Sequence, residues 1–430
     1  MALISSITAR EILDSRANPT IETTVALDNG IVMSSSVPSG AAIGKYEVIE
    51  LRDNDKDRYL GLGVTKAVTY VNKVIGPGLV GVDPSRQIEI DDWMTKVDGT
   101  EQMERFGGNT ILSLSQALAR AAAYSLQMPL YRYVNALYAQ LGTKVELRRV
   151  PAPIFNVING GKHGAGNLDF QEFHIIPASS KSYAASIQMG VELYHQVRKV
   201  LIDKNAIHSV GDEGGYAPNL YTNLDAFEII MQAVRGSSYQ FGEDIFIGLD
   251  VASDHFYKKD HYKIRDKQQA MRTDDFISYL VDLNSQYHLL MLEDPLYGDD
   301  WTGWKKLTAQ LGEDVIIVGD DLIATNLERL KKAQQEQACT GVLVKANQAG
   351  TLTETLRVIQ FAQKNNFKVT VSHRSGETND DFAADLAVGI QCDYVKFGAP
   401  ARGERVAKYN RLLTIVDELT HEETSSTSHS

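Results

Sequence analysis

The chain has 430 residues, more than the roughly 250 to 300 at which a single hydrophobic core stops growing, so we expect two domains. Its 43% apolar and 23% charged residues are ordinary for a globular protein and show no bias toward disorder. A formal net charge of −12 disfavours nucleic acids and anionic membranes as partners, because both would be repelled at long range. Any anionic substrate therefore needs a locally positive pocket.

Cysteine usage indicates the compartment. Two cysteines, Cys339 and Cys392, are too few for a disulfide framework, so a reducing environment is expected and the cytoplasm fits best. The N-terminus lacks a basic region followed by an apolar run of signal-peptide length, and the chain has no run of about 18 apolar residues. We therefore expect neither export by that route nor a membrane span.

Residues 1–141 mix alternating and helical patterns, which predicts an α+β domain. Residues 20–27 alternate apolar and polar side chains, and the turn formers at 28–30 follow before the alternation resumes, which predicts a hairpin. Over residues 109–141 apolar side chains recur at helical spacing, and Pro129 marks a break.

After Val150 short apolar runs alternate with amphipathic helices, the pattern of parallel strands with crossover helices. In a TIM-type (β/α)8 barrel the carboxyl ends of such strands converge on one face, where active sites are built. We therefore predict an α/β barrel over residues 142–419 whose ionisable strand ends share one pocket. These strand ends are Asp250, Glu293, Asp320, Lys345, His373 with Arg374, and Lys396.

The last residues, 420–430, follow an amphipathic helix that is expected to end near Leu419. They contain no apolar run that could pack on a core. They are predicted to be a disordered tail.

Three of the strand ends predict a metal site. Asp250, Glu293 and Asp320 would repel one another on one barrel face unless a cation lay among them, and oxygen ligands alone favour magnesium over zinc. A single acidic residue at a strand end could instead cap the strand or interact with a helix dipole. Three such residues beside cationic strand ends favour the metal.

The cationic strand ends predict a base and an anion site. Lys345 ends an apolar run, where desolvation and nearby cations would lower its pKa enough for a neutral amine to act as general base; a salt-bridge lysine is the alternative. His373, Arg374 and Ser375 offer a phosphate or carboxylate cradle, with Lys396 on the next strand. His373 could instead be a hydrogen-bonded core histidine.

Two glycine-containing loops complete the candidate site. The loop GDEGGYAPN places Glu213 between an aspartate and two glycines, and NVINGGKHGAGNLDFQEF carries His163, Gln171 and Glu172. Either loop alone could be only a turn. Their coexistence with the metal site favours a functional role for both.

These segments closely resemble the enolase family over nearly the whole chain. The matching strings, in family order, are EILDSRANPTIE, VPSGAAIG, ELRDNDKDRYLG, NVINGG, QEF, VGDEGGYAPN, GLDVA, LEDP, VGDDL, VKANQAGT, SHRSGET and ERVAKYNRLL. The resemblance implies an N-terminal α+β capping domain, a barrel whose first strands depart from the simple parallel pattern, and a homodimer. It also implies the magnesium-dependent, reversible dehydration of 2-phosphoglycerate to phosphoenolpyruvate in glycolysis and gluconeogenesis.

The resemblance assigns roles residue by residue. It implies that Asp250, Glu293 and Asp320 ligate magnesium, that Lys345 is the base, and that Glu213 is the acid. It further implies support from Glu172, with a pKa of Glu213 raised by that neighbour, and His373 beside them. The implied substrate contacts are His163, Gln171, Arg374, Ser375 and Lys396.

One loop departs from the family pattern. The family reads SGASTG where this chain reads SGAAIG, so Ala42 and Ile43 replace serine and threonine. The serine ordinarily helps to ligate a second magnesium ion, which should therefore bind more weakly here. We hypothesise an altered second-metal requirement or reduced turnover.

Two other functions stay open. The chain could act on a related phosphorylated or phosphonate hydroxy acid, or it could be a weakly active paralogue with a binding role. The retained Arg374 and Lys396 argue against the first, and the retained Lys345 and Glu213 argue against the second.

Overall fold

The computed structural model describes residues 2–40, 44–164, 166 and 168–427, with the backbone alone described for residues 422–427. Ala42 and Ile43, which depart from the family pattern, therefore lie outside the described residues.

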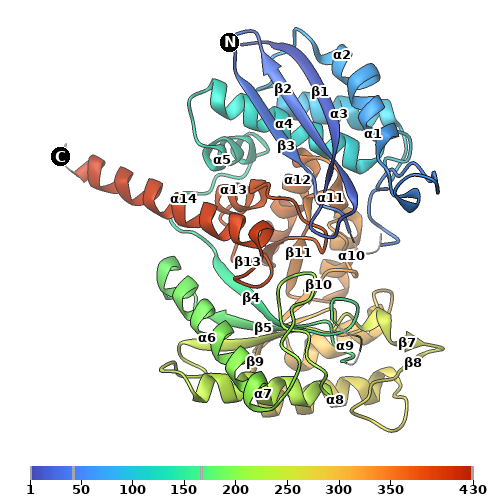
Figure 1. Ribbon diagram of the computed structural model, residues 1–430, viewed down its shortest axis with the longest axis vertical. Helices are drawn as coiled ribbons and strands as arrows, with labels where there is room; N and C mark the ends of the chain where they lie inside the picture. Colours follow the sequence, from blue (N-terminus) through green and yellow to red (C-terminus); the bar gives the residue numbers. More distant parts are fainter. Residues whose placement is uncertain (1, 41–43, 165, 167, 428–430) are drawn as a thin grey trace.

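An antiparallel sheet forms the outer layer of the N-terminal domain (Figure 1). Its strands are β1 (Ile4–Leu13), β2 (Pro19–Leu27) and β3 (Val32–Ser36), in that order. Ile21 and Val25 of β2 are fully buried, whereas the residues that alternate with them are partly exposed, because successive strand side chains point to opposite faces. The predicted hairpin is confirmed by the pairing of β2 with β3.

Helices cover the inner face of this sheet. The helix α4 (Gly108–Ser125) packs against β2 and β3 on one side and against helices of the barrel domain on the other, so it is buried almost all round. Pro129 precedes α5 (Leu130–Gln140), which confirms the predicted break. The remaining helical segments here are η1 (Tyr59–Gly61), α1 (Thr65–Tyr70), η2 (Val71–Ile75), α2 (Gly76–Leu79) and α3 (Gln87–Asp98).

The second domain is a closed barrel of eight strands, as predicted. The six strands predicted to end in ionisable residues are all present and mutually parallel. In the order in which they close the barrel, the strands are β10 (Ile316–Gly319), β11 (Gly341–Val344), β12 (Lys368–Ser372), β13 (Tyr394–Lys396), β4 (Ala152–Asn159), β5 (Glu172–Pro177), β6 (Ile245–Asp250) and β9 (Leu289–Glu293).

The strand β5 departs from the parallel pattern, as the family resemblance implied. It pairs antiparallel with both β4 and β6. The described part of the segment between β4 and β5, residues 160–164, 166 and 168–171, contains no helix, and a parallel crossover needs a dozen or more residues with a packed element. The chain therefore turns back beside β4, and Glu172, the first residue of β5, lies at the same barrel end as Asp250.

Helices surround the barrel (Figure 1). Two of them, α6 and α7, lie between β5 and β6 in the chain. The helices that cover the barrel and its ends are α6 (Tyr183–Asp203), α7 (Asn223–Arg235), α8 (Thr273–Tyr287), α9 (Trp301–Leu311), α10 (Leu327–Glu336), α11 (Ala346–Ala349), α12 (Leu352–Lys364), α13 (Phe382–Gly389) and α14 (Gly403–Thr427). The small elements η3 (Ser253–His255), β7 (Tyr257–Lys258) and β8 (His261–Tyr262) follow β6.

The end of α14 corrects the predicted tail. The helix does not stop near Leu419 but continues to Thr427, so residues 420–427 are helical and only 428–430 of the predicted tail lie outside the described residues. A lack of apolar side chains argues against packing on a core, but polar residues such as glutamate are good helix formers once a helix is already packed upstream. Among the described residues, no helix is long and apolar enough to cross a membrane.

Half-buried polar contacts join the two domains beside the strand-end loops. Arg120 of α4 donates to Asp380 at 2.8 Å and to Asp381 at 2.7 Å, just before α13. Burial raises the pKa of Asp380, but the Arg120 charge and several donated hydrogen bonds lower it overall. The segment that leads from β12 to this contact carries three candidate site residues, so the contact fixes that segment against the N-terminal domain.

We expect replacement of Arg120 by leucine to lower the free energy of unfolding by about 2 kcal/mol, because two half-buried carboxylates lose their charged hydrogen-bond donor. The pKa of Asp380 is lowered in the folded state, so its pairing stabilises the fold above the ordinary aspartate pKa and this stabilisation is lost as the pH falls. The difference between wild type and variant should therefore shrink in acid. Urea unfolding at several pH values measures it.

Arg10 provides a matched control. Its pair with Glu22 lies on the exposed surface, so Arg10→Leu should cost less than about 1 kcal/mol. Equal costs for the two variants would contradict the role given to Arg120.

Candidate active site

A pocket of about 310 Å³ lies where the carboxyl ends of the barrel strands meet the loops. It brings together the residues predicted from the sequence. Glu293 alone among them is not part of its lining, and it lies behind the pocket, bonded to Lys396. The predicted residues that line it are His163, Gln171, Glu172, Glu213, Asp250, Asp320, Lys345, His373, Arg374, Ser375 and Lys396.

The three predicted metal ligands come from adjacent strands. Asp250, the last residue of β6, pairs in register with Glu293, the last residue of β9. Asp320 directly follows β10, the next strand. The strand register therefore places three buried carboxylates side by side, and Gln171 donates to one of them, Asp250, at 3.2 Å.

Lys396 is the cation that lies against these carboxylates. Its Nζ lies 2.8 Å from both oxygens of Glu293, 3.1 Å from Glu172 and 3.6 Å from Asp250. Burial and the neighbouring Asp250 charge nevertheless raise the pKa of Glu293 well above its ordinary value. Negative charge therefore remains in excess at this wall, and the oxygen donors match a hard divalent cation.

Two further aspartates extend this acidic wall. Single oxygen atoms of Asp294, Asp320 and Asp321 all lie within 4.8 Å of one another. Asp294 accepts the backbone N–H groups of Asp320 and Asp321, each at 2.8 Å, so it fixes the turn after β10. Burial and the charge of Asp320 raise the pKa of Asp321 to about 7. Asp294 lies in the motif LEDP and Asp321 in VGDD, but only the first acidic residue of each motif was predicted to be a metal ligand.

Lys345 differs from its prediction in one respect. Its ammonium donates a short hydrogen bond to Asp320. Burial lowers the pKa of Lys345, but the Asp320 carboxylate outweighs burial and the pKa is raised, not lowered. A salt-bridge lysine was the alternative expected at this position, and the pairing of Lys345 with Asp320 matches that alternative.

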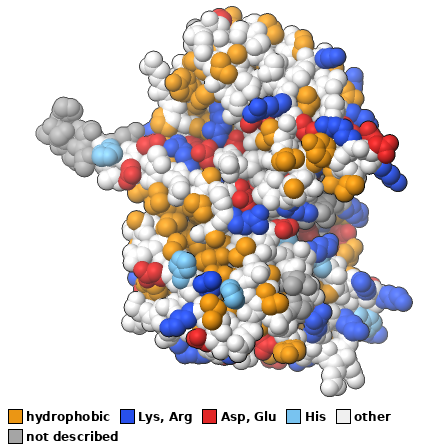
Figure 2. Space-filling view, viewed as in Figure 1, with side chains coloured by type: hydrophobic (Ala, Val, Ile, Leu, Met, Phe, Trp, Pro, Cys, Tyr) orange, Lys and Arg blue, Asp and Glu red, His pale blue; other side chains and the backbone are white. Residues whose placement is uncertain are grey.

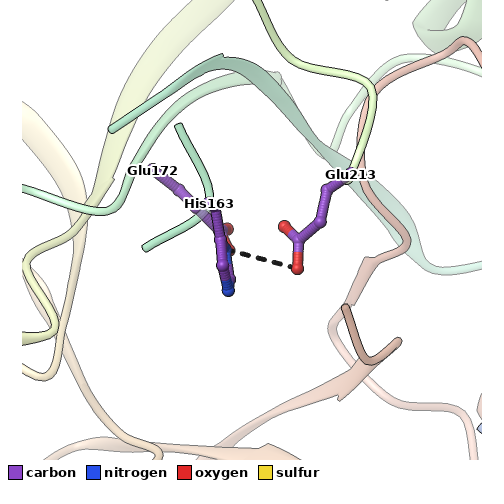
Figure 3. Close-up of side chains that lie close together, drawn as sticks. All are labelled: His163, Glu172 and Glu213. Carbon is purple, nitrogen blue, oxygen red and sulfur yellow. Dashed lines mark hydrogen bonds and ion pairs between the residues drawn. The ribbon is translucent and has the colours of Figure 1, made fainter. Parts of the chain in front are cut away.

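The acid pair lies next to this wall, because Glu172 pairs in register with Asp250 (Figure 3). His163 and Glu213 point toward each other in this view, and Glu172 lies beside the histidine. His163 Nδ1 lies 3.1 Å from Glu172 Oε1 and 3.4 Å from Glu213 Oε1. Burial lowers the pKa of His163, but the two carboxylates raise it to about 10, so the ring is a cation in this state.

The pKa of Glu213 also differs from its prediction. Burial raises it, but the charges of His163 and His373 lower it well below the ordinary value, whereas Glu172 was expected to raise it. The sequence could not show that a histidine lies between the two glutamates. His373 itself is buried, with its Nε2 3.4 Å from Glu213 and its Nδ1 2.7 Å from Arg405.

In the predicted phosphate or carboxylate site, Arg374 pairs with a residue of the protein that the sequence did not predict. Arg374 donates to Glu47 of the N-terminal domain at 2.9 Å and to Asn347 at 2.9 Å. Ser375 Oγ lies 3.3 Å from His163 Nε2. No local pattern marks Glu47, because it acts across the domain boundary, far from Arg374 in sequence.

Arg405 is a further residue that sequence reasoning missed. It is fully buried on α14 and donates to the backbone carbonyls of Arg374 and Ser375, so it holds the cradle segment in place. A signal existed, because Arg405 shares the buried helical face of Tyr409 and Leu412.

A third group of missed residues lies beneath the acid pair. His174 of β5 is fully buried, and its Nε2 lies 2.9 Å from Glu172. Asn156 of β4 is its partner in the strand register and donates to Glu213 at 3.0 Å. Both residues lie in strands that are otherwise apolar, and the sequence of such a strand does not show which side chain a single polar residue contacts.

Comparison with known proteins agrees with this architecture. Residues 4–134 match the family model described as "Enolase, N-terminal domain", and residues 148–429 match "Enolase, C-terminal TIM barrel domain". Proteins named enolase from Ehrlichia ruminantium (strain Gardel) and Ehrlichia canis (strain Jake) are each 45% identical to this chain. The first aligns over 412 residues, 96% of both chains, and the second over 416 residues, 97% of this chain and 96% of the relative. The chain therefore belongs to the enolase family.

Proposed function

We propose that this protein catalyses the magnesium-dependent, reversible dehydration of 2-phosphoglycerate to phosphoenolpyruvate. One observation carries the proposal: a lysine on a wall of carboxylates, Lys345, shares one pocket with a carboxylic acid pair, Glu172 and Glu213. Removal of a proton beside a carboxylate and departure of a hydroxide need a base and an acid of this kind. The names of the relatives support the same reaction.

Magnesium fits the acidic wall, because the wall offers carboxylate oxygens, of which those of Asp294, Asp320 and Asp321 lie within 4.8 Å of one another. Asp250, Glu293 and Asp320 would hold the ion. When bound there, magnesium supplies positive charge that stabilises the charge developing on the substrate carboxylate.

Lys345 acts as the base in this proposal. Its Nζ accepts the proton on C2 of 2-phosphoglycerate as the C2–H bond breaks. The amine must first be neutral, which requires that Asp320 exchange its lysine partner for another cation.

Glu213 acts as the acid. It gives a proton to the hydroxyl group on C3 as the C–O bond breaks with its electron pair on oxygen, so water leaves. Glu172 lies beside the same histidine, so a proton on either glutamate relieves the repulsion between the two buried carboxylates.

The remaining polar residues bind the substrate. Arg374, Ser375 and His163 face the phosphate, and Gln171 and Lys396 contact the organic part of the molecule. This local set of cations answers how a chain of net charge −12 binds a multiply charged anion.

We expect the purified protein to form phosphoenolpyruvate from 2-phosphoglycerate, to lose this activity with a chelator, and to regain it with magnesium. Lys345→Ala should lower kcat by about 10²- to 10⁴-fold and should abolish exchange of the C2 proton with D2O, because the base is gone. Ultraviolet absorbance follows the product and proton NMR follows the exchange.

Activity that survives Lys345→Ala would overturn the proposed mechanism. If 2-phosphoglycerate is inert, a panel of related phosphorylated and phosphonate hydroxy acids tests the second substrate class. Binding without turnover of any of them would favour the paralogue with a binding role.

The second magnesium site is expected to be weak, because Ala42 lacks the hydroxyl of the family serine. Ala42→Ser should lower the magnesium concentration needed for half-maximal activity several-fold. Magnesium titration of initial rates measures this. Identical titration curves for the two proteins would contradict an effect of Ala42.

We further propose that the protein is a homodimer in the cytoplasm. Large hydrophobic side chains are exposed at the end of α6 and in the loop after it: Ile202, Ile207, Val210 and Tyr221. Hydrophobic side chains also gather near the middle of the face shown in Figure 2.

Both cysteines are buried and free, which agrees with a reducing compartment.

Sedimentation of the wild type should give about twice the chain mass of 47.5 kDa. The double variant Ile207→Asp with Val210→Asp should shift the protein toward monomer, because charged side chains are depleted at interface cores. Val80→Asp, at an exposed hydrophobic position of the N-terminal domain, is the control. A monomeric wild type would refute the dimer.

A further inference from the structure

The loop that carries Glu213 is hydrogen-bonded to β4. Tyr216 N donates to Val157 O at 2.9 Å, and Asn159 N donates to Tyr216 O at 2.7 Å. A Cβ atom at Gly215 would lie 3.0 Å from Asn156 Oδ1 and 2.5 Å from Asn159 Oδ1, so the glycine lets the loop close over these two side chains. The acid and two buried asparagines therefore form one packed unit.

Of these two asparagines, Asn156 reaches the acid. Its Nδ2 donates to Glu213 Oε2 at 3.0 Å, and the residue is fully buried. It does not line the pocket, so it has no access to substrate. Asn159 is also buried, but within the described residues neither of its side-chain polar atoms has a hydrogen-bond partner.

We propose that Asn156 is a positioning residue that selects which oxygen of Glu213 carries the proton given to the leaving hydroxyl. This inference rests on the proposed function, because it needs Glu213 to be the acid.

The selection follows from the chemistry of an amide. The NH2 group of asparagine is a donor and has no lone pair to accept a proton. Asn156 Nδ2 lies 3.0 Å from Oε2 and His373 Nε2 lies 3.4 Å from the same oxygen, so a proton on Oε2 would meet the amide hydrogens and is disfavoured there. Oε1 is left. It lies 3.4 Å from His163 Nδ1, but the single hydrogen on that nitrogen bonds to Glu172 Oε1 at 3.1 Å, so Oε1 of Glu213 can carry the proton at the pocket wall.

The same hydrogen bond persists through the step. Before transfer, Oε2 is the carbonyl oxygen of a carboxylic acid and accepts from Asn156; after transfer, it is a carboxylate oxygen and accepts more strongly. The bond therefore favours proton loss from Oε1, and it holds the side chain in one orientation in both states. His174, the strand partner of Asn156, lies in a similar place beneath the other glutamate, with its Nε2 2.9 Å from Glu172 Oε2.

The test separates the two halves of the reaction. In D2O, exchange of the C2 proton of 2-phosphoglycerate reports the base, and phosphoenolpyruvate formation reports base and acid together. Asn156→Leu removes the donor with little change in shape. We expect a loss of about 10- to 100-fold in phosphoenolpyruvate formation, the usual cost of removing such a supporting partner, with C2 exchange and KM within about threefold of wild type.

Asn159→Leu is the matched control. It changes the same residue type on the same strand against the same glycine, without touching Glu213. Both of its rates should stay close to those of wild type.

A conservative variant gives an independent readout. Asn156→Asp keeps the shape but can donate to Oε2 only when its own carboxyl is protonated. Its rate of phosphoenolpyruvate formation relative to wild type should therefore rise as the pH falls, whereas the ratio for Asn156→Leu should stay flat. This variant also keeps the inference testable if the leucine variant does not fold.

The inference is overturned if Asn156→Leu slows exchange and product formation equally, if it slows neither, or if Asn159→Leu gives the same loss. A flat pH ratio for Asn156→Asp also overturns it. If the wild-type protein gives neither exchange nor product, the proposed function itself is contradicted, and this outcome is distinct from those that contradict only the role of Asn156.

Discussion

Buried negative charge at the ends of adjacent barrel strands is the constraint on which the rest of the site depends. Strand register alone places Asp250 beside Glu293, and Asp320 follows on the next strand. Such charges are tolerated in a protein interior only with partners, and here Lys345 and Lys396 reach them from β11 and β13. The barrel therefore supplies both the charges and their compensation, and each lysine is tied to the carboxylate that determines its protonation.

Because of this pairing, the base and the acid of the proposed reaction both have the protonation state opposite to the one that the reaction needs. Lys345 holds its proton because of Asp320, and Glu213 is ionised because of His163 and His373. A site that is internally paired costs less than one with bare charges, but its pairs must be exchanged before it works. A divalent cation and a phosphorylated acid bring charges of opposite sign, so together they can exchange the pairs without leaving a large net charge in the pocket.

The sequence predicted the strand ends well, and the reason is geometric. Parallel strands bring their carboxyl ends to one face, so residues such as Asp250 and Lys396 could be placed together without coordinates. The family resemblance, and not periodicity, predicted the departure of the first strands. What failed were statements about pairing: the pKa directions of Lys345 and Glu213 depend on which side chain lies within about 3 Å, and residue order does not contain that distance.

Residues that act through others were also beyond the sequence. Asn156 is hidden in an apolar strand, and its effect depends on the loop that packs over it. The extension of α14 was missed for a different reason, since polar composition bears on packing and only weakly on helix formation. Glu47 was also beyond the sequence. It lies in another domain and occupies Arg374, so an anion that binds Arg374 must compete with it, and pocket occupancy is thereby linked to the position of the N-terminal domain segment that carries Glu47.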